Sequence, residues 1–165
     1  MSAIKTIRIS PQEMKSTFIK RLRVFDFSAE DAERCATIFT ENSLDGVYSH
    51  GVNRFPRFVD YLKRGLVLPK NKPQLKKQMG VIEQWNGAMG AGPLNAFFAT
   101  NRALELAEEN GMGCIALSNT NHWMRGGYYG WQAAKKGYLY IGWTNTTAIM
   151  PAWGAQDSKL GNNPL

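Results

Sequence analysis

The most informative segment of this sequence reads Gly46-Val47-Tyr48-Ser49-His50-Gly51-Val52-Asn53-Arg54-Phe55-Pro56-Arg57-Phe58-Val59-Asp60-Tyr61-Leu62. It contains His50, one of the two histidines in the chain, where a helix is expected to begin. Arg54 follows four residues later, so a helix through both would put them on one face. A proton-exchanging group and a fixed cation together suit a small anionic substrate with a carbonyl to be protonated. The alternative is that His50 packs at a helix start and Arg54 is a solvated surface charge.

Length and composition are those of an ordinary globular chain. The 165 residues predict one domain or slightly more, and the 44% hydrophobic fraction is enough to build a core. The two cysteines, Cys35 and Cys114, lack metal-ligand spacing, so we expect buried free thiols in a reducing compartment and no metal site. No apolar run is long enough to span a membrane, and the N-terminus lacks a signal-peptide core. We therefore expect a cytoplasmic protein with no membrane partner.

The formal net charge of +7 limits the possible partners. Much of the positive charge lies in two clusters, which are Lys15, Lys20, Arg21 and Arg23, then Lys63, Arg64, Lys70, Lys72, Lys76 and Lys77. A basic balance favours anionic partners, such as nucleic acid, a phosphorylated cofactor or an acid substrate. Because no nucleic-acid-binding pattern is present, we expect no nucleic-acid partner and favour a solvated basic face.

Residues 1–66 predict a helical segment. The expected elements are a short edge strand over 3–9 and helices that end near Phe25, before Gly46 and at Arg64. The first helix opens with the capping pattern Ser10-Pro11-Gln12-Glu13, and Ser28 caps the second. The apolar face of the second helix is Ala29, Ala32, Cys35, Ala36, Phe39 and Leu44. Because proline is tolerated only in a first turn, Pro56 places the start of the third helix near Asn53.

The remaining residues predict a linker over 67–80, within the Pro- and Lys-rich stretch that begins at Leu66, and an α/β unit over 81–165. Expected elements are strands over 80–85, 114–117 and 138–143 and helices over 94–110 and 127–136. The strand over 114–117 is apolar, and we expect it to be central. The predicted fold class is therefore mixed α/β, or α+β, with helices followed by a partial mixed sheet.

Three loops of this unit are candidates for chemistry. Gly90-Ala91-Gly92 precedes a helix, but Asn95 stands where a dinucleotide motif needs its third glycine, so a flexible turn is favoured over a phosphate cradle. His122 lies in the polar loop after strand 114–117, where chemistry is common; the alternative is a hydrogen-bonded loop residue beside Trp123. Residues 144–147 follow strand 138–143 and could serve a ligand or form a turn.

The segment Gly46–Phe58 resembles the conserved motif of the malate/L-lactate dehydrogenase-like family, also called L-sulfolactate dehydrogenase-like. The stretches Asn121-His122-Trp123-Met124-Arg125-Gly126-Gly127 and Gly130-Trp131-Gln132-Ala133-Ala134 strengthen the resemblance, which covers essentially the whole chain. The family consists of nicotinamide-dependent 2-oxo-acid reductases without the Rossmann fold. The resemblance implies that residues 81–165 are the first part of a cofactor-binding domain. It also implies NADH as cofactor, with NADPH as the alternative, and a homodimer.

The resemblance assigns roles to four residues of this chain. It implies that His50 donates a proton to the substrate carbonyl and that Arg54 binds the substrate carboxylate. His122 matches a loop histidine with an acid/base role in some ureidoglycolate-type members, so a shared catalytic role stays open. Thr146 matches a hydroxyl residue that contacts the cofactor. The implied reaction is reduction of a small 2-oxo or 2,3-diketo sugar acid, and ureidoglycolate, malate or lactate is the alternative within the family.

Two features depart from the family pattern. Gly161-Asn162-Asn163-Pro164-Leu165 stands where Gly-Thr-Asn-Pro-Leu is usual. Family members are also about twice as long, and the family resemblance puts most cofactor-binding segments and an acidic partner of the catalytic histidine beyond these residues. We therefore expect the N-terminal half of an enzyme, through truncation, a split gene or a frameshift. The alternative function is an inactive fragment that only docks to a partner or an anion.

Overall fold

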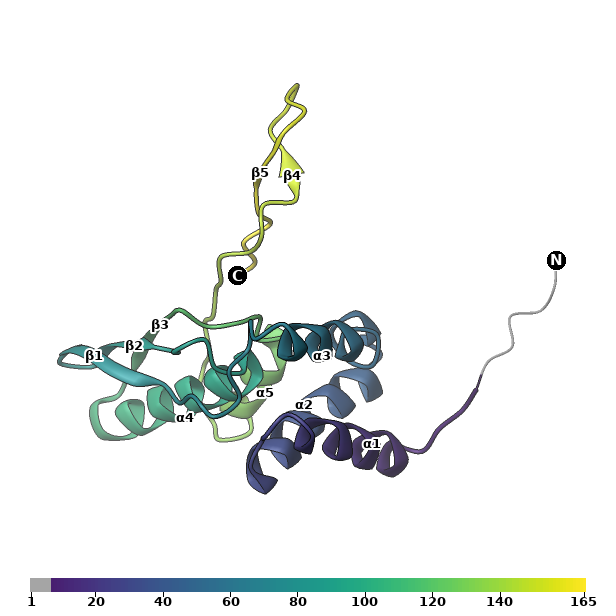
Figure 1. Cartoon of the computed structure of the whole chain (residues 1–165). Coiled ribbons are helices and arrows are strands. Elements are labelled where there is room, and N and C mark those ends of the chain that lie inside the picture. The colour runs from purple at the N-terminus through teal and green to yellow at the C-terminus, as the bar shows by residue number, and fades with distance from the viewer. Residues whose placement is uncertain (1–6) are drawn as a thin grey trace.

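The computed structural model describes residues 7–165 (Figure 1). In chain order the elements are α1 (Pro11–Arg23), α2 (Ala29–Leu44), the 3₁₀ turn η1 (Tyr48–His50), α3 (Phe55–Lys63), β1 (Gln74–Met79), β2 (Ile82–Asn86), α4 (Gly92–Asn110), β3 (Cys114–Ser118), α5 (Gly126–Ala134), β4 (Met150–Pro151) and β5 (Ser158–Leu160). Helices come first and a small sheet follows, which confirms the predicted mixed α/β class. The strand predicted over 3–9 lies largely outside the described residues, and residues 7–9 are not in a strand.

The helical part is held by helix caps and an aromatic core. Ser10 Oγ accepts from the Glu13 N–H at 3.1 Å, and Ser28 Oγ accepts from the Asp31 N–H at 3.0 Å. Both predicted N-caps are confirmed, and each satisfies an otherwise unpaired N–H of a first helical turn. The core centres on buried rings from α1, α2 and α3, which are Phe18, Phe39, Phe55 and Phe58. This packing places the start of α3, and with it Arg54, against the end of α2.

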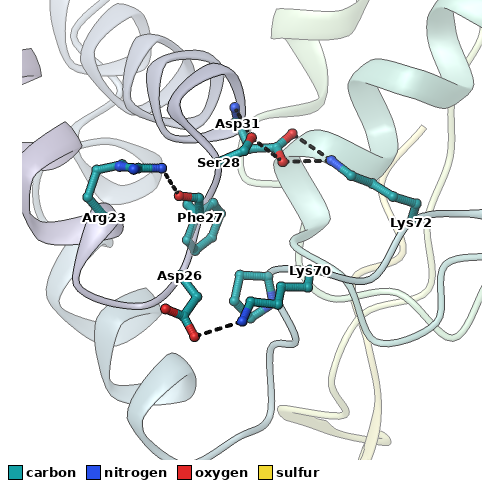
Figure 2. A pocket seen from close by; sticks show the side chains of 8 residues that line it. Arg23, Asp26, Phe27, Ser28, Asp31, Lys70 and Lys72 are labelled. Carbon is teal, nitrogen blue, oxygen red and sulfur yellow. Dashed lines mark hydrogen bonds and ion pairs between the residues drawn. The ribbon is translucent and has the colours of Figure 1, made fainter.

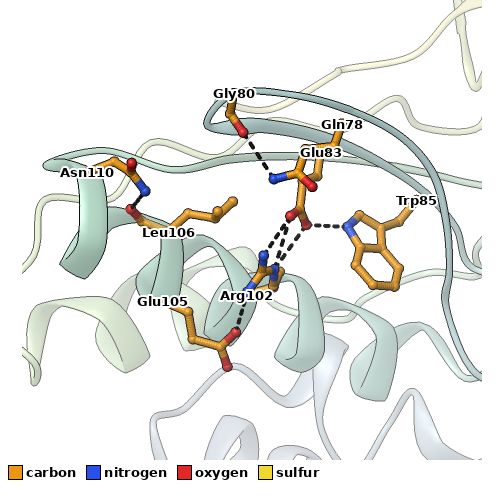
Figure 3. A network of polar contacts seen from close by, with 8 residues as sticks. All are labelled: Gln78, Gly80, Glu83, Trp85, Arg102, Glu105, Leu106 and Asn110. Carbon is orange, nitrogen blue, oxygen red and sulfur yellow. Dashed lines mark hydrogen bonds and ion pairs between the residues drawn. The ribbon is translucent and has the colours of Figure 1, made fainter.

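The small sheet has the order β1-β2-β3. β1 and β2 pair antiparallel, and β2 and β3 pair parallel with α4 as the crossover between them. An ion pair attaches α4 to the sheet, because Glu83 of β2 is 1% exposed and receives Arg102 Nη2 at 2.7 Å (Figure 3). Trp85 Nε1 also donates to Glu83 at 2.8 Å. The parallel pairing brings the loops after β2 and β3 to the same edge of the sheet.

Several predictions about secondary structure are wrong. The last part of the predicted loop and linker is strand β1, whose side chains are all exposed, so the sequence has no apolar alternation there. β3 is an edge strand rather than a central one. Residues 138–143 are in no strand, although they alternate. By contrast, α3 starts at Phe55, near the predicted Asn53, and Pro56 occupies its first turn as predicted.

The predictions of buried side chains are mostly confirmed. Cys35 is fully buried, which raises the pKa of its thiol, whereas Cys114 is only half-buried; both thiols are free. Leu44 is 59% exposed and Ala29 is exposed, so neither belongs to the buried face of α2. Both residues stand at the ends of the helix, where little packs over them.

Residues 138–165 form a C-terminal arm, which begins against the body, residues 7–137, where Tyr140 is half-buried beside Gly130, and then projects away from it (Figure 1). Its regular structure is the short antiparallel pair of β4 and β5. Apolar side chains of the arm are exposed, with Leu139 at 87% and Trp153 at 105% of their reference surface. Within the described residues, no helix combines the length and apolar character needed to cross a membrane.

Candidate active site

His50 is held at the end of η1, directly after α2. Its ring nitrogen Nδ1 lies 2.9 Å from Ser49 Oγ, and its carbonyl accepts a hydrogen bond from Asn42 Nδ2 at 3.1 Å. The side chain is half-buried. His50 is thus fixed through both its ring and its backbone while part of the ring stays accessible.

The loop after β3 carries His122, and the preceding residue, Asn121, anchors this loop. Asn121 Nδ2 lies within hydrogen-bond distance of three carbonyl oxygens, those of Leu66 at 3.1 Å, Met89 at 3.0 Å and Gly90 at 3.1 Å. Met124, at φ 70°, donates its N–H to His122 Nδ1 at 2.9 Å. A neutral His122 therefore carries its proton on Nε2, because Nδ1 is used as an acceptor.

Gly92 explains the Gly-x-Gly motif. It is the first residue of α4, and a Cβ there would overlap the carbonyl oxygens of Asn121 and His122. The glycine therefore permits close approach of the His122 loop. The favoured interpretation as a turn before a helix agrees with this structure, in which α4 begins at Gly92.

The fold brings the two histidines together. Their ring centroids are 5.6 Å apart, although one follows α2 and the other follows β3. Arg54 and His122 also line the same pocket, together with Phe58, Tyr61, Val67, Asn121 and Met124. This pocket measures about 10 Å³, which is room for roughly one water molecule. Three of the four predicted site residues thus form one cluster at the junction of the helical part and the sheet.

Burial, followed by the positive charge at this junction, lowers both histidine pKa values. Burial, then Arg54, His50 and Arg57, lowers the pKa of His122 to about 4. Burial, then Arg54, lowers the pKa of His50 from its ordinary value. Part of the His122 side chain nevertheless remains exposed to solvent. Both rings are largely neutral at pH 7, and a bound anion would raise both pKa values.

Arg54 is available to bind an anion. It is the N-cap residue of α3 and half-buried, and within residues 7–165 it takes part in no ion pair. Arg125, in the adjacent loop, is instead paired with Asp45. A guanidinium without a carboxylate partner, beside two neutral histidines, is suited to a carboxylate ligand.

A larger pocket of about 420 Å³ lies between the α1–α2 turn and residues 69–72 (Figure 2). Its lysines are already paired, Lys72 with Asp31 at 2.7 Å and Lys70 with Asp26 at 3.0 Å. These ion pairs connect the helical part to the chain before β1. The positive charges of these two lysines are therefore balanced by carboxylates of the helical part.

Thr146 is separate from the other predicted site residues. It lies in the C-terminal arm, and its hydroxyl is 2.9 Å from Asn162 Oδ1, while its N–H donates to Asn163 Oδ1 at 2.9 Å. Thr146 is half-buried on this arm. Its predicted cofactor contact stays a prediction.

Sequence reasoning missed the residues that hold the two histidines. Asn42 and Ser43 lie at the end of α2, and Asn121 immediately precedes His122. Asparagine and serine at a helix end usually indicate local capping. Their bonds to distant backbone atoms depend on the folded chain and leave no periodic signal.

The fold and the cluster agree with comparisons to known proteins. A family model described as malate/L-lactate dehydrogenase matches residues 9–165. The chain therefore belongs to the malate/L-lactate dehydrogenase family.

Within the family, the chain is similar to reductases of one name. The chain is 48% identical over 159 residues to the 2,3-diketo-L-gulonate reductases of Salmonella newport (strain SL254) and Salmonella typhimurium (strain LT2). Each match covers 96% of this chain and 48% of the relative. The chain thus spans about half the length of the curated relatives it matches.

Solved structures show the same fold. Malate dehydrogenase from Pyrococcus horikoshii OT3 is similar with a TM-score of 0.88 and 28% identity, covering 96% of this chain and 45% of that chain. Sulfolactate dehydrogenase from Methanocaldococcus jannaschii gives a TM-score of 0.87 and 30% identity, covering 96% and 46%. Because 96% of the chain aligns, most of the C-terminal arm is included in these similarities.

Proposed function

We propose that this chain carries the proton-donating and carboxylate-binding part of the active site of a nicotinamide-dependent oxidoreductase. Its substrate is a 2-oxo or 2,3-diketo sugar acid. The observation that carries the proposal is the convergence of His50, His122 and Arg54, with the histidine rings 5.6 Å apart. The substrate class is supported by relatives named 2,3-diketo-L-gulonate reductase at 48% identity.

His50 is the proposed proton donor. His122 uses Nδ1 to accept from the Met124 N–H, and its pKa is lowered to about 4, so it is poorly suited to carry a second proton. His50 has Ser49 Oγ at its Nδ1 instead, and a hydroxyl can accept as well as donate. Protonated His50 can therefore keep this hydrogen bond while donating from Nε2. His122 stays neutral and donates a hydrogen bond from its Nε2–H to the substrate.

Arg54 couples binding to proton transfer. Burial, and after it the charge of Arg54, lowers the pKa of His50 in the free chain. A substrate carboxylate bound to Arg54 neutralises that charge and raises the pKa of His50. The acid is thus protonated more readily when substrate is present, which favours delivery of the proton to the carbonyl oxygen.

The nicotinamide cofactor, when bound, supplies the hydride for the carbonyl carbon. NADH is proposed, with NADPH as the alternative, on the family resemblance. Thr146 is the one residue of this chain proposed to contact it, and the Thr146 hydroxyl must exchange its bond with Asn162 to do so.

The proposal is tested by His50→Ala in the native protein. Loss of a general acid lowers kcat by about 10²–10⁴-fold, and circular dichroism should show an unchanged fold. Reduction of 2,3-diketo-L-gulonate is measured as the oxidation of NADH. Dehydrogenation of malate, lactate and ureidoglycolate is measured in parallel. Normal turnover in His50→Ala would transfer the acid role to His122 or remove the assignment.

A second proposal concerns the C-terminal arm. Its exposed Leu139 and Trp153 favour an interface with further polypeptide. The arm resembles the corresponding segment of proteins more than twice as long, so we propose that a segment equivalent to the rest of those chains covers it. A second copy of this chain is the alternative occupant. If the chain is an inactive fragment that only docks to a partner, it would use the same exposed side chains of the arm.

Light scattering and cofactor fluorescence separate these possibilities. The 165-residue chain is measured alone and with the part of the Salmonella typhimurium relative that it does not match. A one-to-one complex that changes the fluorescence of added NADH supports the unmatched segment as the occupant. Self-association abolished by Trp153→Lys supports a second copy, and a complex without cofactor response supports docking alone.

A further inference from the structure

The end of α2 lies directly against the turn that carries His50. Asn42 Nδ2 donates to the His50 carbonyl at 3.1 Å, and the Val47 N–H donates to the Asn42 carbonyl at 2.9 Å. Ser43 Oγ accepts from the Val52 N–H at 2.9 Å. These contacts hold the turn on both sides of the histidine.

The packing leaves this turn no freedom to move toward the helix. Asn42 is 0% exposed and Ser43 is 4% exposed. A Cβ at Gly51 would overlap Ser43 Oγ, so the turn already contacts the helix end closely. Any loss of the Asn42 bond therefore acts on the His50 backbone rather than on a solvated loop.

Asn42 places a polar amide in a fully buried position. Its Oδ1 is buried and, within the described residues, has no hydrogen-bond partner. A buried unpaired acceptor is unfavourable for stability. The Nδ2 donor alone is used, and the opposite amide orientation would place Oδ1 against the His50 carbonyl oxygen. The one hydrogen bond that the Asn42 amide makes is the bond to the His50 carbonyl, and this bond sets the orientation of the amide.

We propose that Asn42 is a positioning residue for His50, with Ser43 in the same role at Val52. Asn42 fixes the backbone of His50 so that the ring stays near His122 and Arg54. The geometric claim stands by itself, and its catalytic consequence rests on the proposed function.

The test follows the two histidine rings of the 165-residue chain by NMR, without ligand. Because the chain has two histidines, single His50→Gln and His122→Gln variants assign the signals. In Asn42→Leu we expect the His50 ring signals to shift, the contact between the two rings to weaken and the pKa of His50 to rise. The rise follows because a displaced ring is less buried and farther from Arg54.

The matched control is Thr40→Val on the same helix. Thr40 is 4% exposed and its Oγ1 is also unpaired, yet it makes no recorded bond to the His50 turn within the described residues. Thr40→Val should leave the His50 titration at its parent value. If Asn42→Leu does not fold, Ser43→Ala reports the same effect through Val52. An unchanged His50 titration in the folded variant, or an equal change in Thr40→Val, would overturn the proposal. Turnover is not part of this test, so its failure is distinct from failure of the proposed function.

Discussion

The body of this chain buries large apolar side chains, whereas the C-terminal arm exposes them. In the body, Phe39 is 0% exposed and packs against Phe55 at a centroid distance of 5.1 Å. In the arm, Trp153 is fully exposed. The body can therefore be stabilised by its own core, whereas the arm gains little from its apolar side chains. The histidine cluster belongs to the body, and the proposed cofactor contact belongs to the arm.

The largest expected effect separates the two regions directly. Phe39→Ala should lower the free energy of unfolding by about 3–5 kcal/mol, because it leaves a cavity among buried rings. Trp153→Ala is the matched change in the arm and should alter it by less than about 0.5 kcal/mol. Urea denaturation of the 165-residue chain measures both. Equal losses would show that the arm contributes to the same core.

A somewhat smaller effect is expected at the ion pair between β2 and α4. Arg102→Met leaves the buried Glu83 carboxylate without its main partner, whose hydrogen bonds hold the pKa of Glu83 low. We expect a loss of about 3 kcal/mol at pH 7. The loss should shrink at low pH, where Glu83 becomes protonated. A denaturation midpoint that matches the parent at pH 7 would contradict this account.

The helices of this chain could be predicted from the sequence more fully than its strands. The helices were predictable because their caps, Ser10 and Ser28, act within one turn. β1 was missed because a strand with exposed side chains has no apolar alternation and is stabilised by its pairing with β2. Residues 138–143 have the alternation of a strand, but alternation cannot supply a pairing partner.

The candidate site was predictable residue by residue but not as a cluster. Local spacing identified His50 and Arg54, and the position after a strand identified His122. Their convergence depends on the parallel β2–β3 pairing and on the carbonyl contacts of Asn121. Such contacts join segments far apart in the sequence, and no local pattern encodes them.

The smallest expected effect is the pH dependence of stability. The folded pKa of His122 is about 4, below the value of about 6.5 expected in the unfolded chain. The unfolded state therefore binds more protons between these values, and stability falls as pH is lowered from 6.5 to 4. His50 acts in the same direction. His122→Gln should remove part of the decrease in the urea midpoint; because the side chain is exposed, we expect less than about 1 kcal/mol.

The central claim is that Arg54 binds a carboxylate and thereby raises the pKa of His50. The most direct measurement is an NMR titration of the His50 ring in the 165-residue chain, with and without saturating oxamate, a carboxylate analogue of a 2-oxo acid. The account predicts a higher His50 pKa with oxamate, and about 10–100-fold weaker oxamate binding in Arg54→Ala, since a charge-assisted bond is lost. An unchanged His50 pKa at saturation, or equal binding in Arg54→Ala, would contradict it.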